Sequence, residues 1–101
     1  MSISDRVIRI NKNTMKLYFK HEAESNLGMG IAYVEFDGDW ASRQVEIYGD
    51  KWFLSNRDYH PETGGIALCD QSLSETGLGT EHEISESEFE LVWSEAIKKS
   101  M

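Results

Sequence analysis

The chain has 101 residues, a formal net charge of −8, 40% hydrophobic residues and one cysteine. Such a chain forms one domain, residues 1–101, and is too apolar to stay disordered. Its acidity argues against nucleic acid as a partner, and it lacks the run of about 18 apolar residues that a membrane helix needs. Cys69 cannot form an internal disulfide, and the N-terminus does not resemble a signal peptide, so we expect a cytoplasmic protein.

The first half of the chain alternates between apolar and polar residues in the way that strands do. Residues 11–22, 31–36, 40–48 and 51–55 are the predicted strands, and residues 5–10 are a candidate edge strand. Asp37-Gly38 and Gly49-Asp50 supply the tight turns between them, and residues 23–30 form a loop. Short strands joined by tight turns predict an antiparallel meander.

The C-terminal segment predicts a helix of about 14 residues. Ser85 with Glu88 matches a capping box, and Ile84 with Phe89 matches a hydrophobic staple. We expect Trp93 to contribute most to stability. One apolar stripe follows at three- and four-residue spacing: Phe89, Val92, Trp93, Ala96 and Ile97. The predicted fold class is therefore α+β: a single antiparallel sheet of four or five strands with one C-terminal helix packed on one face.

Two features suggest a polar site. Asp58, His60 and Glu62 alternate in one loop, and these residue types serve as metal ligands or as acid–base groups. An ordinary polar loop has the same composition, so no metal site is predicted. Arg43 shares the orientation of Val45, which points into the core, and we expect it to form an ion pair. The chain has no phosphate-binding loop and no nucleophile elbow, so we predict no cofactor and no catalysis.

The acidic charge is concentrated in the last part of the chain, because residues 61–101 carry nine carboxylates and two lysines. Helix capping explains some of these carboxylates. The sequence leaves open whether the others share one face: Asp70, Glu75, Glu81, Glu83, Glu90 and Glu95. Aromatic side chains make good contact residues, and the sheet face away from the helix would expose Tyr48 and Phe53, with Tyr18 and Tyr33 as further candidates. We predict that these carboxylates and aromatics bind a basic protein partner.

Three segments together resemble a known family. The run W-x-x-R-Q-V-E-I-Y-G-D-K at 40–51 is followed by HPETGG and then by ISESEFELVW at 84–93. This order is similar to that of a family of small, uncharacterised bacterial domains, over roughly residues 31–97. The resemblance implies the same fold and a bacterial or phage origin, and it transfers no catalytic residue.

The favoured function is a non-enzymatic binding protein of the inhibitor or immunity type, which neutralises a basic protein. One alternative is a small-ligand protein or enzyme that uses Asp58, His60 and Glu62, with Arg43. The other is a structural module that oligomerises through an edge strand. We expect a monomer or a weak homodimer.

Overall fold

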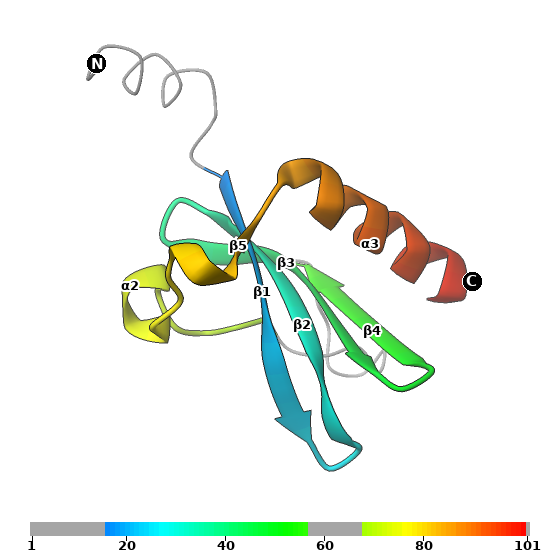
Figure 1. Ribbon diagram of the computed structural model, residues 1–101. Coiled ribbons are helices and arrows are strands. Elements are labelled where there is room, and N and C mark those ends of the chain that lie inside the picture. Colours follow the sequence, from blue (N-terminus) through cyan, green and yellow to red (C-terminus); the bar gives the residue numbers. More distant parts are fainter. Residues whose placement is uncertain (1–15, 57–67, 101) are drawn as a thin grey trace.

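The computed structural model describes residues 16–56 and 68–100, and it confirms the predicted α+β fold. The sheet is antiparallel, with the strand order β4-β3-β2-β1-β5 (Figure 1). The strands are β1 (Lys16–Ser25), β2 (Gly28–Asp37), β3 (Trp40–Tyr48), β4 (Lys51–Asn56) and β5 (Glu83–Ile84). The helices are α2 (Leu73–Thr76), the short 3-10 helix η2 (Thr80–His82) and α3 (Glu86–Ser100). None of the helices in these ranges is long and apolar enough to cross a membrane.

The strand boundaries differ from the predicted ones mainly at the first hairpin. The expected loop at 23–30 is a two-residue turn, Asn26-Leu27, so β1 and β2 are each 10 residues long. Gly28 follows the turn with a φ of 103°, which residues other than glycine rarely adopt. The fifth strand is β5, a segment of two residues that pairs with Tyr18 and Phe19. The candidate edge strand at 5–10 lies outside the described residues.

The sheet has two covered faces. Helix α3 covers one, here called the helix face, whereas α2, η2 and the chain from Leu68 cover the other, here called the loop face (Figure 1). Tyr18 and Tyr33 lie on the helix face, 6% and 8% exposed, so the prediction that they are exposed is wrong. The buried residues of the loop face are Phe19, Ala32, Val34, Phe36 and Ala41.

A β-bulge explains which residues share a face. The turn at Asp37 pairs Phe36 with Ala41, and a regular hairpin would then pair Glu35 with Ser42. The register instead shifts between Glu35 and Phe36, and Glu35 pairs with Arg43. An extra residue in one strand reverses the side-chain alternation beyond it. As a result, the later part of β3 shares the helix face with Tyr33, whereas its earlier residue Ala41 lies on the loop face.

Helix α3 begins as the sequence predicts. The Ser85 hydroxyl accepts a hydrogen bond from the backbone N–H of Glu88 at 3.1 Å, which caps the helix. Ile84 packs against the cluster that contains Phe89. Phe89 is fully buried, and its ring lies 5.2 Å from that of Tyr18, whereas Trp93 is only partly buried. Phe89 is therefore the centre of the helix contact, in place of the expected Trp93.

Replacing Phe89 with alanine should lower the free energy of unfolding by about 3–5 kcal/mol, because it leaves a cavity beneath α3. Leu91 lies on the same helix and is 73% exposed, so Leu91→Ala should change stability by less than about 0.5 kcal/mol. Urea titrations of the two variants measure this difference. Equal losses would show that α3 is not anchored through Phe89.

Candidate functional site

An ion network built on Glu35 and Arg43 lies beneath α3. The Glu35 side chain is 2% exposed, and a buried carboxylate is stable only when its oxygens are paired. The Arg43 guanidinium donates to both oxygens, from Nε at 2.9 Å and from Nη2 at 2.7 Å. The Ser42 hydroxyl donates to Oε1 at 2.6 Å, and the nearby Tyr18 hydroxyl helps to lower the pKa of the same carboxylate. The ion pair expected at Arg43 is present.

The network also joins the sheet to the helix. Arg43 donates to Glu90 of α3, from Nη1 at 3.2 Å and from Nη2 at 2.5 Å. Its guanidinium carbon lies 5.0 Å from the ring centres of both Phe89 and Trp93, a distance that suits a cation–π contact. Arg43 therefore holds α3 in place, and four of its five N–H donors bond to Glu35 and Glu90. It is a structural residue in this arrangement.

The network changes the acidity of its members. Burial alone would raise the pKa of Glu35, but hydrogen bonds from Arg43 and Ser42 and the charge of Arg43 outweigh it and lower the pKa from 4.5 to about 2. Burial and the neighbouring Glu35 carboxylate raise the pKa of the Tyr18 hydroxyl above its usual range. Both groups keep one protonation state near neutral pH, as structural groups do.

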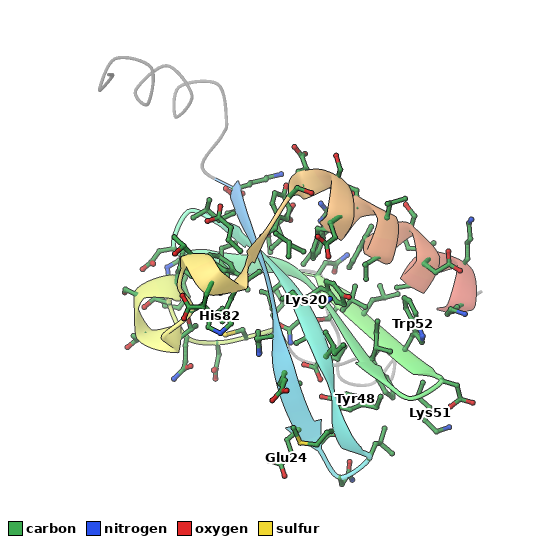
Figure 2. The ribbon with its side chains drawn as sticks, viewed as in Figure 1. Lys20, Glu24, Tyr48, Lys51, Trp52 and His82 are labelled. Atoms are coloured by element: carbon green, nitrogen blue, oxygen red, sulfur yellow. The ribbon has the colours of Figure 1, made fainter. Side chains whose placement is uncertain are left out.

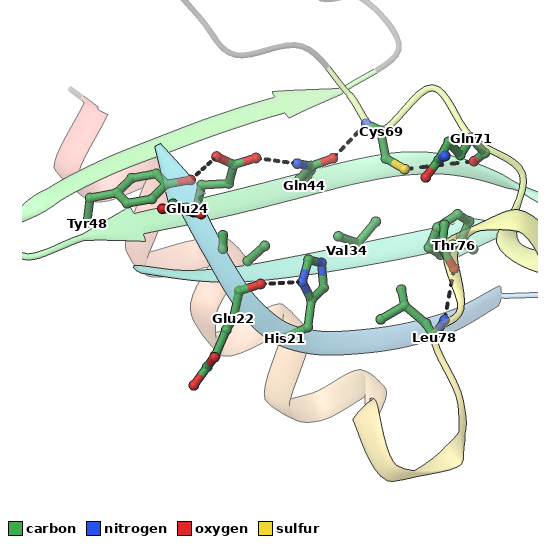
Figure 3. A pocket seen from close by; sticks show the side chains of 14 residues that line it. His21, Glu22, Glu24, Val34, Gln44, Tyr48, Cys69, Gln71, Thr76 and Leu78 are labelled. Carbon is green, nitrogen blue, oxygen red and sulfur yellow. Dashed lines mark hydrogen bonds between the residues drawn. The ribbon is translucent and has the colours of Figure 1, made fainter. Parts of the chain in front are cut away.

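The loop face holds a cavity of about 420 Å³ (Figure 3). Ala32, Val34 and Phe36 of β2 line it with apolar side chains. The β3 wall is polar: Tyr48 donates to Oε1 of Glu46 at 2.6 Å, and Gln44 donates to Oε2 of Glu46 at 2.5 Å. The remaining lining residues come from β1, α2 and the segments beside α2: His21, Glu22, Ala23, Glu24, Cys69, Gln71, Thr76 and Leu78.

Gln44 also anchors the segment that enters α2. Its side-chain oxygen accepts a hydrogen bond from the backbone N–H of Cys69 at 2.8 Å, as Figure 3 shows. The polar wall therefore runs without a break from Tyr48 through Glu46 and Gln44 to Cys69. Paired in this way, the side chains hold fixed positions before any ligand arrives, which suits a binding site.

A glycine allows Tyr48 to occupy its position. A Cβ added at Gly30 would lie 2.2 Å from the Ile47 carbonyl oxygen and 2.4 Å from the Tyr48 ring, so no larger residue fits there. Tyr48 is 6% exposed, and the prediction that it is exposed is wrong. Burial and the bond to Glu46 raise the pKa of its hydroxyl. Phe53 is partly buried, and its ring lies 6.3 Å from that of Tyr48.

A second hollow, of about 590 Å³, lies at the outer edge of β1. It meets the first cavity at four shared lining residues, and we call the two hollows together the β1 groove. The shared residues are His21, Glu22, Thr76 and Leu78. Lys20, Ile31, Gly77 and His82 complete the second hollow. Figure 2 shows Lys20, Glu24 and His82 along β1 and beside η2.

The carboxylates singled out in the sequence do not share one face. Glu90 and Glu95 belong to α3 over the helix face, whereas Asp70, Glu75 and Glu81 belong to the segments that cover the loop face. Glu83 is in β5, opposite Phe19 of β1. Three of these carboxylates have contacts within the described residues: Glu90 binds Arg43, Glu75 accepts hydrogen bonds from Ser72, and Oε2 of Glu81 lies 3.6 Å from Nδ1 of His82.

The loop with Asp58, His60 and Glu62 lies outside the described residues, so its relation to Arg43 stays a prediction. Within residues 16–56 and 68–100, no group of three or more His, Cys, Asp and Glu side chains could hold a metal ion.

Sequence reasoning missed Glu35, Gln44 and Glu46. One signal was available for Glu35, since it is the single charged residue in the apolar run IAYVEF. Its partner could not be found, because the bulge changes the pairing. Gln44 and Glu46 are polar and alternate with Val45, a pattern that by itself indicates solvent-facing residues and not a wall of a cavity.

Helix α3 packs on one face of the sheet, and the other face has a hollow with an apolar floor and fixed polar walls. These features define a small α+β binding domain. The model of one protein family, described as Myosin VI cargo binding domain, matches residues 8–97. The chain belongs to this family. It is 35% identical over 78 residues to "Myosin heavy chain 95F" of Drosophila melanogaster, which covers 75% of this chain. "Unconventional myosin-VI" of Sus scrofa and of Mus musculus is 30% identical over 79 residues, or 73% of this chain.

Each of these relatives is far longer than this chain, which spans 6% of their length. The family is a protein-binding module and not an enzyme, so the predicted absence of catalysis and the predicted protein partner both agree with it.

The family corrects two predictions. The resemblance to bacterial domains is wrong, and so is the inhibitor or immunity function inferred with it, because the matched family is that of a myosin cargo-binding domain. The physical reason lies in the motifs themselves. The run at 40–51 forms β3 and its turn, and the run at 84–93 starts and caps α3. Such folding signals recur in unrelated proteins with a helix on a sheet, so they do not identify a family.

Arg43→Met should lower the free energy of unfolding by about 3 kcal/mol, because it leaves Glu35 buried without its cation. Glu90→Gln should cost less than about 1 kcal/mol, because the Glu90 side chain is 44% exposed and water can replace its contact with Arg43. Urea unfolding at pH 7 tests both variants. If Glu90→Gln proved as harmful as Arg43→Met, the helix contact and not Glu35 would dominate.

The folded protein should lose stability in acid as Glu35 is protonated. Because its pKa is lowered to about 2 on folding, the Glu35 contribution is complete above about pH 4.5 and is lost as the pH falls from 4.5 towards 2. Carbon-13 NMR of the Glu35 carboxyl measures its pKa directly. A Glu35 carboxyl that titrated at its ordinary value of 4.5 would contradict the network.

Proposed function

We propose that this domain recruits a protein cargo by binding a segment of it in the β1 groove. The observation that carries the proposal is the family match over residues 8–97, whose description is that of a cargo-binding domain. The β1 groove supports the location, because it combines an apolar floor with polar groups at fixed positions.

The groove can hold one apolar side chain of the cargo and can orient the cargo backbone beside it. Ala23 and Leu78 line the groove and are only partly buried, so they form a surface that an aliphatic or aromatic side chain of the cargo would cover. The two Glu46 oxygens each accept one bond within the chain and keep further lone pairs. These lone pairs would accept from a backbone or side-chain N–H of the cargo.

We further propose that the cargo segment is basic. Glu22 and Glu24 are exposed on β1 at the rim of the groove, and the whole chain carries a net charge of −8. A basic segment would be attracted to this rim and would associate faster at low salt. We also propose that the binding unit is a monomer or a weak homodimer.

Filling the groove should weaken cargo binding. Ala32→Phe places a ring on the floor, and Gln71→Trp places one at the exposed rim, where it does not disturb the sheet. A cargo is first captured by cross-linking from a cell extract and is then produced as a pure protein. Its Kd, measured by calorimetry, should rise about tenfold or more for either variant, which corresponds to about 1.4 kcal/mol.

Leu91→Ser is the matched control for this experiment, because Leu91 is exposed on α3, away from the loop face. It should leave the Kd unchanged. If the Leu91 variant lowered the affinity while both groove variants left it intact, the cargo would bind the α3 side and the proposed location would be wrong.

A further inference from the structure

We propose that the cargo segment binds as an added β-strand along the outer edge of β1, with basic and apolar side chains alternating along it. This inference rests on the proposed function, because it specifies how a cargo would occupy the β1 groove.

The outer edge of β1 is only partly paired. Strand β2 pairs with β1 along its whole length, from Lys16 to Ser25. On the other side, β5 pairs only with Tyr18 and Phe19. Among the described residues, no strand pairs with this edge from Lys20 to Ser25. An edge of this kind is a template for another strand, and β5 already shows that an antiparallel strand fits there.

The direction of the peptide groups follows from the hairpin. Its two-residue turn closes on the pair Ser25 and Gly28, so Ser25 exchanges hydrogen bonds with β2. Antiparallel pairing alternates along a strand, and therefore Lys20, Glu22 and Glu24 direct their N–H and C=O groups to the outer edge. The Glu22 carbonyl is contacted by the His21 ring, whose Nδ1 lies 2.7 Å away. This contact joins neighbouring residues, and the hydrogen bonds of an added strand can replace it.

The side chains on the two faces of this edge favour different partner residues. A cargo residue opposite His21 or Ala23 would point to the loop face, towards Leu78 in the β1 groove, and should be apolar. A cargo residue opposite Glu22 or Glu24 would point to the helix face. There it would meet one of these carboxylates.

Two exposed apolar residues stand beside those carboxylates. Ile31 pairs with Glu22 across the hairpin, and Met29 pairs with Glu24. Ile31 is 36% exposed and Met29 is 62% exposed. A lysine or arginine suits these cargo positions, because its charge would reach Glu22 or Glu24 on the adjacent strand, whereas Ile31 and Met29 lie one strand further away. Two copies of this edge would bring their carboxylates together, which disfavours pairing of the chain with itself.

A proline at position 22 tests the pairing. The Glu22 N–H points to the outer edge, so Glu22→Pro removes a donor for the added strand without removing a bond to β2. Glu22→Ala removes the same charge and keeps the N–H, and it is the matched control. The probe is a random dodecapeptide library on phage, panned against the full chain, and the best peptide is then synthesised.

The selected peptides should alternate lysine or arginine with apolar residues. Fluorescence polarisation should show affinity lowered about tenfold or more by Glu22→Pro and less than about threefold by Glu22→Ala, since one exposed ion pair contributes little. Bound peptide should also slow hydrogen exchange of the Lys20, Glu22 and Glu24 amides in the unmodified chain, a measurement that does not depend on the fold of the proline variant. Unchanged exchange, or peptides with apolar residues at helical spacing, would overturn the proposal.

The groove variants separate this proposal from the proposed function. If Ala32→Phe and Gln71→Trp weaken the peptide while Glu22→Pro does not, the groove binds cargo without strand pairing and the present inference fails. If only Glu22→Pro weakens it, the edge pairs with a strand and the proposed cavity is wrong. If no variant weakens it, both proposals fail.

Discussion

The bidentate pair between Glu35 and Arg43 is the interaction on which the rest of the structure depends. A carboxylate that is 2% exposed cannot remain charged in the sheet without a partner, and the bulge in β3 brings Arg43 opposite it. The same guanidinium reaches Glu90 and lies against the rings of Phe89 and Trp93. One cation therefore fixes the strand register, the position of α3 and the orientation of its aromatic residues.

The two faces of the sheet have different roles in this arrangement. The helix face is closed by a long helix whose central residue, Phe89, is fully buried. The loop face is covered by α2 and η2, which together have seven residues, and it retains the cavity. Both faces have a buried hydrophobic cluster, but the groove lies on the loop face, beside the shorter covering elements.

How much of the structure could be predicted depended on how far apart in sequence the interacting residues are. The Ser85 cap, the α3 stripe from Phe89 to Ala96 and the limits of β3 follow from contacts between near neighbours in sequence, and they were predicted correctly. Ile97, the last residue of the predicted stripe, is 41% exposed. The errors at Tyr18 and Tyr33 have one cause, because the bulge exchanges the faces of β2 and β3 relative to a regular hairpin. The burial of Tyr48 depends on Gly30, a residue of the neighbouring strand. The family resemblance failed because its motifs encode a strand and a helix cap, which many proteins share.

The sequence by itself determined the α+β class, the four long strands, the capped helix and the acidic charge, because periodicity, turn chemistry and composition act locally. Only the tertiary structure decided that Arg43 meets Glu35, that the acidic residues of the last segments are divided between two sides of the sheet, and that a groove opens along β1. Each of these depends on a strand register or on packing between segments far apart in the chain. A single residue added by a bulge changes such contacts without leaving a signal in the hydrophobic pattern.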